Sequence, residues 1–131
     1  MATSFLNVDL MVHASQDPSV LATAWGEDIL MLNCHQENGQ YQACFELGEE
    51  TPGEHTPENV ILALCHLVSG LSGEAREMFN RAHNKVLDIG FDAPAMESNF
   101  SNNISSDTLA LAASLGMDLA ITVYPYRDEL A

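Results

Sequence analysis

The chain of 131 residues carries 19 Asp and Glu residues against four Lys and Arg residues, giving a formal net charge of −15. Such a surface repels nucleic acid and anionic membranes and attracts cationic partners over long distances. Because 47% of the residues are hydrophobic, the charge does not indicate disorder, and the length suits one domain over residues 1–131.

The first half of the chain predicts a strand, a short helix and a hairpin, over residues Leu6–Ala14, Asp17–Gly26, Ile29–His35 and Tyr41–Leu47. The first strand alternates apolar and polar residues, which is typical of a half-buried strand. Asp17 and Pro18 provide a cap and a first helical position, and Gly26 ends the helix. Trp25 is expected in the core.

The hairpin is predicted from a two-residue turn at Asn38-Gly39. Its register places Cys34 opposite Ala43 and Cys44 opposite Asn33. Cys34 and Cys44 then point to opposite faces of the sheet and cannot readily form a disulfide. Three cysteines, an odd number, also argue against a disulfide framework.

The second half predicts, after an acidic loop, two helices, a strand, a helix and a strand: Thr56–Gly70, Ser72–Lys85, Leu87–Phe91, Ser105–Leu115 and Leu119–Tyr124. The first of these helices has a threonine cap, then a proline and an acid at its positive end. In the second, Arg76 and Lys85 are expected to face solvent. The polar stretch Ala93–Asn103 has room for a short edge strand near Phe100.

The resulting order, β-α-β-β-α-α-β-α-β, predicts a single α+β domain. It suits an antiparallel or mixed sheet of about five strands with helices packed on one face. The apolar runs are too short to cross a bilayer, and the first residues lack a basic region before an apolar one. We therefore expect a cytoplasmic protein.

The histidines and cysteines do not have the spacing of a metal site. Cys34-His35 lies on a predicted strand and Cys65-His66 on a predicted helix, where neighbouring side chains diverge. No Cys-x2-Cys or His-x3-His spacing is present, so no metal or cofactor is predicted. Cys44 lies on the polar face of its strand, where nearby carboxylates raise a thiol pKa and disfavour a nucleophile. No catalytic residue is assigned.

The last third of the chain carries a family resemblance. Residues Ile104–Gly116 form a capped helix closed by a glycine, and Met117–Tyr124 form a final strand. This ending resembles that of small uncharacterised bacterial proteins, some of which are similar to immunity proteins that neutralise toxins. The resemblance implies a protein-binding function and carries over no catalytic residue.

The sequence therefore predicts a non-enzymatic acidic binding protein, most concretely an immunity protein or inhibitor of a cationic toxin or nuclease. The expected partner-binding residues are acids with aromatic anchors: Glu49, Glu50, Glu54, Asp88, Asp92, Tyr41 and Tyr126. The alternative is a small ligand-binding domain or enzyme with a pocket between sheet and helices. A third interpretation is an oligomerising module in which an exposed sheet edge pairs with itself.

Overall fold

A computed structural model describes residues 3–48, 53–93 and 99–125. The elements are β1 (Ser4–Ala14), α1 (Ser19–Trp25), β2 (Ile29–Glu37), β3 (Gln40–Leu47), α2 (Pro57–Ser69), α3 (Gly73–Arg81), β4 (Asn84–Ala93), α4 (Ser106–Ser114) and β5 (Asp118–Pro125). A short 3-10 helix, Gly26–Asp28, joins α1 to β2. The α+β class predicted from the element order is confirmed.

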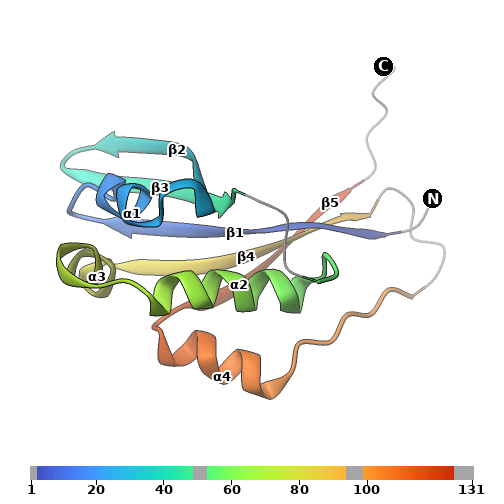
Figure 1. The fold of residues 1–131 in the computed structure, drawn as a ribbon. Helices are drawn as coiled ribbons and strands as arrows, with labels where there is room; N and C mark the ends of the chain where they lie inside the picture. Colours follow the sequence, from blue (N-terminus) through green and yellow to red (C-terminus); the bar gives the residue numbers. More distant parts are fainter. Residues whose placement is uncertain (1–2, 49–52, 94–98, 126–131) are drawn as a thin grey trace, which may run out of the picture.

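The five strands form one mixed sheet in the order β2-β3-β1-β4-β5. All neighbours are antiparallel except β4 and β5, which are parallel and are connected through α4. Figure 1 shows α2, α3 and α4 along the same side of the sheet, with β1 in the middle of the strand order. The predicted packing of helices on one face is therefore observed for the described helices.

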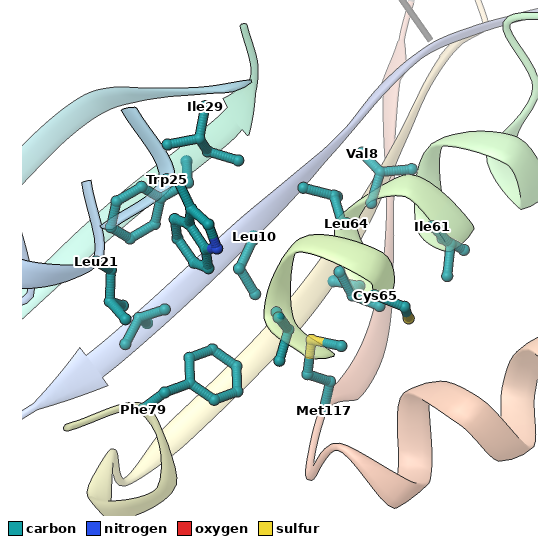
Figure 2. Close-up of a cluster of buried hydrophobic side chains, with 14 of the residues drawn as sticks. Val8, Leu10, Leu21, Trp25, Ile29, Ile61, Leu64, Cys65, Phe79 and Met117 are labelled. Atoms are coloured by element: carbon teal, nitrogen blue, oxygen red, sulfur yellow. The ribbon is translucent and has the colours of Figure 1, made fainter. Parts of the chain in front are cut away.

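The core lies between this face of the sheet and the helices. Every second residue of β1 from Val8 to Ala14 is buried, as the alternation of its sequence predicts. Figure 2 shows Val8 and Leu10 of β1 reaching toward Leu64 of α2. The side chains of α2 that meet the sheet recur at helical spacing, so a single apolar stripe of the helix covers the central strand.

Trp25 anchors α1 to this core. Its indole N–H donates a hydrogen bond to the backbone oxygen of Leu67, at 2.9 Å, and its ring meets Phe45 edge-on at 5.4 Å between centroids. The expectation that Trp25 is a core residue is confirmed. The helix itself begins at Ser19, one residue later than predicted, and a carboxylate oxygen of Asp17 accepts the Ser19 N–H.

The hairpin has the predicted turn and register. Asn38 and Gly39 both have positive φ, 53° and 76°, as a two-residue turn between twisted strands requires. Cys34 pairs with Ala43 and Asn33 pairs with Cys44. Of the two thiols, that of Cys34 is exposed and that of Cys44 is buried, and both are free.

The prediction that the second helix continues to Lys85 is wrong. The helix ends at Arg81, Ala82 adopts an extended ψ of 143°, and the His83 N–H donates to the backbone oxygen of His13 at 2.7 Å. Lys85 already lies in β4, opposite Val12 of β1. Pairing with the central strand outweighs the helical pattern of this segment, because it extends a ladder of backbone hydrogen bonds.

Two further expectations are corrected. Arg76 does not simply face solvent: its guanidinium donates to the backbone oxygens of Val68 and Ser69, in the last turn of α2, and of Leu71, just after the helix. Residues 99–105 contain no strand, so the edge strand predicted near Phe100 is absent there. The Phe100 ring instead meets the buried Phe91, with 5.3 Å between centroids.

Candidate functional site

One face of the sheet is left uncovered by the described helices, and we call it the open face. The side chains that point to it alternate with the core residues along the three inner strands, and most are partly exposed. Those of β1, β3 and β4 include Asn7, Asp9, Met11, His13, Gln40, Gln42, Cys44, Glu46, Asn84, Val86, Asp88 and Asp92. The open face therefore holds many of the carboxylates of these strands.

Three of these carboxylates lie side by side across adjacent strands, and we call Glu46, Asp9 and Asp88 the acidic row. Asp9 pairs directly with Asp88 of β4. On the other side Leu10 pairs with Phe45, so the next position places Asp9 beside Glu46 of β3. Like charges directly opposite on neighbouring strands are destabilising. The sequence places this row at the centre of the sheet, where the repulsion is a cost to folding.

Polar contacts hold the ends of the acidic row. The Asn7 side-chain amide donates to Glu46 Oε2 at 3.2 Å, and the Thr122 hydroxyl donates to Asp88 Oδ1 at 2.7 Å. The Thr122 contact ties β5 to the row. Each bond leaves the carboxylate with further acceptor capacity, since an ionised carboxylate has about four lone-pair sites.

Burial and the neighbouring acids raise the pKa of Asp9. Desolvation is the largest cause, followed by the negative charges of Glu46 and Asp88, and a hydrogen bond from the Cys44 thiol acts in the opposite direction. The same surroundings raise the pKa of Cys44 to about 11, again mainly through burial. The prediction that Cys44 lies among acids with a raised pKa is confirmed, and its thiol is a poor nucleophile.

The described cations all lie in the helix layer or point toward it. Arg76 and Arg81 belong to α3, and Lys85 shares the core-facing side of β4, with its ammonium 5.0 Å from the centre of the Phe79 ring. Burial lowers the pKa of Lys85. The strands contain no other Lys or Arg within the described ranges, so the open face there has carboxylates and no fixed positive charge.

The predicted partner-binding residues are only partly brought together. Asp88 and Asp92 share the open face, both half-buried. Tyr41 pairs with the buried Ala14 and so lies on the opposite face. Glu54 is exposed in the segment that precedes α2, where its backbone oxygen accepts hydrogen bonds from Thr56 and Asn59.

Glu49, Glu50 and Tyr126 lie outside the described residues. Asp9 and Glu46 were missed as site residues. The sequence signal that could have found them is an acid on the polar face of a predicted strand, but only the strand order makes them neighbours of Asp88.

A second feature is an apolar groove on the helix side of β4 and β5, about 310 Å³ in volume. Strand residues Ile89, Phe91, Ile121 and Val123 form one wall, and Phe100 and Ile104 lie across from them. Its size is at the lower end of the range of small-molecule pockets. The alternative prediction is a ligand-binding or catalytic pocket between the sheet and the helices; this groove lies instead between the sheet and the segment that precedes α4, and the alternative function remains a prediction.

A hydroxyl–imidazole pair lies at the far end of β1. Ser15 Oγ is 2.7 Å from His83 Nε2, and the His13 ring meets the His83 ring with 5.4 Å between centroids. Serine nucleophiles need a base at this distance, together with a group that orients the base and donors for an oxyanion. The pair is exposed, and no described carboxylate is hydrogen-bonded to His83, so we assign it no catalytic role.

Within the described ranges, no group of three or more His, Cys, Asp or Glu side chains is placed to hold a metal ion, the acidic row included. The described part of the chain also holds no helix with the length and apolar character that crossing a bilayer requires.

Comparison of the chain with protein-family models, curated proteins and solved structures finds no match. The resemblance of the last third to immunity proteins remains a prediction.

Proposed function

We propose that this protein is a non-enzymatic inhibitor that binds a basic protein, such as a cationic toxin or nuclease, through the open face of its sheet. The observation that carries the proposal is the acidic row, Glu46, Asp9 and Asp88, on a face with no described Lys or Arg. Clustered charge of one sign accelerates the capture of an oppositely charged protein and orients it.

The raised pKa of Asp9 supports the same proposal. Burying a carboxylate between two others weakens the free protein, and the cost persists unless something offsets it. Lysine or arginine side chains of a partner placed over the row would neutralise this repulsion. Binding a cationic partner would therefore relieve a repulsion that is present in the free folded protein. A neutral partner would not relieve it, so the acidic row favours a cationic one.

The test compares two triple variants with the same change in net charge. The first, Asp9→Asn with Glu46→Gln and Asp88→Asn, neutralises the acidic row. The second, Glu27→Gln with Glu74→Gln and Glu77→Gln, neutralises exposed acids away from the open face. Immobilised wild-type chain is exposed at low salt to extracts of the source cell, and the captured proteins are identified and purified for titration.

The expected result is a basic protein whose affinity falls with salt. Its affinity for the row variant should be weaker by roughly a hundredfold, or about 2.7 kcal/mol, and for the other variant by less than about tenfold. If both triples weaken binding equally, the interaction is nonspecific attraction to a negative protein. If no basic protein is captured, the inhibitor proposal fails.

A further inference from the structure

Strand β5 forms one edge of the sheet and lies beside β4, the strand that carries Asp88 of the acidic row. It pairs with β4 in an unbroken register from Asp118 to Pro125 and has no strand on its other side among the described residues. Its core-side residues are unusually exposed: Ile121 has 68% and Val123 has 54% of its surface accessible. Long apolar edge strands are templates for a further strand, and proteins normally protect them with charges, prolines or bulges.

The opposite edge is less suitable. Strand β2 also exposes apolar side chains, among them Leu30 and Leu32. Its pairing with β3 is interrupted by a register shift between Met31 and Asn33. Such bulges twist an edge strand and interrupt its row of backbone groups. β5 has no register shift, and its single charge, Asp118, lies at its first residue.

The two faces beside β5 differ in chemistry. On the core side, Ile121 and Val123 line the apolar groove. On the open side, the β5 residue that pairs with Asp88 is the small Ala120, and the Thr122 hydroxyl donates to Asp88 Oδ1, so a cation coming from the edge would meet the other carboxylate oxygen. A strand added to β5 would lie about 4.8 Å away, with successive side chains pointing to alternate faces.

We infer that β5 binds an extended segment of the partner in which apolar residues alternate with lysine or arginine. The apolar side chains enter the groove beside Ile121 and Val123. The cationic ones cross Ala120 toward Asp88. This inference rests on the proposed function and adds to it the docking edge and the residue pattern of the partner.

The probes are two capped peptides of about eight residues, the length of β5. In one, lysine alternates with isoleucine or valine; in the other, the same residues are grouped into a lysine block and an apolar block. Both are titrated into labelled full-length chain at low salt, below the concentration at which either peptide self-associates. Affinities come from the anisotropy of a fluorophore on the peptide, and the backbone amide shifts of the isotopically labelled chain locate the site.

We expect the alternating peptide to shift β5 amides and to bind at least tenfold more tightly than the block peptide. Ile121→Gln should remove most of this difference, and Leu30→Gln on β2 should not. Both side chains are already exposed, so neither change disturbs the core. Of two alternating peptides N-methylated on opposite edges, only the one whose free N–H groups face β5 should bind.

Other results would overturn the inference. One such result is that both peptides bind equally, with an affinity that Ile121→Gln does not change and that the acidic-row triple variant abolishes. In that case the open face alone binds cations, and the proposed function stands without β5. If neither peptide binds, the inference about β5 fails, and the capture experiment alone decides the proposed function. Concentration-dependent dimerisation through β5 would assign the edge to a second copy. Filling of the groove by a small apolar probe alone would make it a ligand pocket.

Discussion

Asp9 is the residue at which the sheet's electrostatic cost is concentrated. Its folded-state pKa lies above the ordinary value of 3.8 because of burial, Glu46 and Asp88. A raised pKa means that the folded state holds the proton more tightly than the unfolded state does. The contribution of Asp9 to stability is therefore full below about pH 3.8 and is lost as the pH rises through its folded-state pKa.

Asp9→Asn should consequently raise the free energy of unfolding at neutral pH, by up to about 1 kcal/mol for relief of like charges on neighbouring strands. The asparagine oxygen still accepts from Cys44. The gain should shrink as the pH is lowered and vanish near 3.8. Urea unfolding across this pH range measures the gain in free energy of unfolding, with Glu37→Gln as a control for the loss of one exposed charge. Equal gains for the two variants would contradict a specific repulsion within the acidic row.

At the residue scale, the sequence predicts the features that depend on local geometry. The faces of Cys34 and Cys44 follow from a two-residue turn and the pleat of a strand, and both are confirmed. The acidic row depends on strand order, since Asp9 and Asp88 are far apart in the chain and meet only when β1 pairs with β4. Residue patterns within a strand do not specify which strand will lie beside it.

At the scale of elements, α2 and α4 are joined at their N-termini. Glu58, in the first turn of α2, accepts hydrogen bonds from the Ser105 N–H at 2.6 Å and from the Thr108 hydroxyl at 3.0 Å. The Ser105 hydroxyl in turn accepts from the Thr108 N–H. One carboxylate thus serves the positive ends of two helices, which favours its ionised form.

These hydrogen bonds lower the pKa of Glu58 below its ordinary value of 4.5. Its stabilising effect is therefore fully present above about pH 4.5 and is lost as the pH falls through the folded-state pKa. Glu58→Gln should lower the melting temperature at pH 7 and should cost progressively less in acid. It should also accelerate hydrogen exchange at the Ser105 amide. Unchanged exchange there, relative to Glu54→Gln, would show that the carboxylate does not hold α4.

Element boundaries were least predictable where two structures competed. The segment from Ala82 to Lys85 continues the helical pattern of α3, but its backbone pairs with the central strand instead. Arg76 is a comparable case. Its charge predicts exposure to solvent, whereas its guanidinium donates to three backbone oxygens at the end of α2 and just after it. Both outcomes depend on contacts between elements, which local propensity does not contain.

Over the whole molecule, the net charge of −15 acts against the compact state. Folding brings the acids closer together, so their mutual repulsion lowers the free energy of unfolding. Salt weakens this repulsion, because the screening length falls from roughly 30 Å at 0.01 M to about 3 Å at 1 M. Salt should therefore strengthen the fold, and it should weaken the proposed binding to a cationic partner.

The melting temperature should rise by several degrees between about 0.01 M and 1 M sodium chloride, with each kcal/mol worth about 4 °C for a domain of this size. Choline chloride should give a similar rise if screening is the cause. The variant with Glu27, Glu74 and Glu77 replaced by glutamine carries three fewer charges and should show a smaller rise. A melting temperature that is constant or falls with salt would mean that the acids are spread widely enough not to oppose folding, which would also remove the electrostatic reason for a dedicated acidic face.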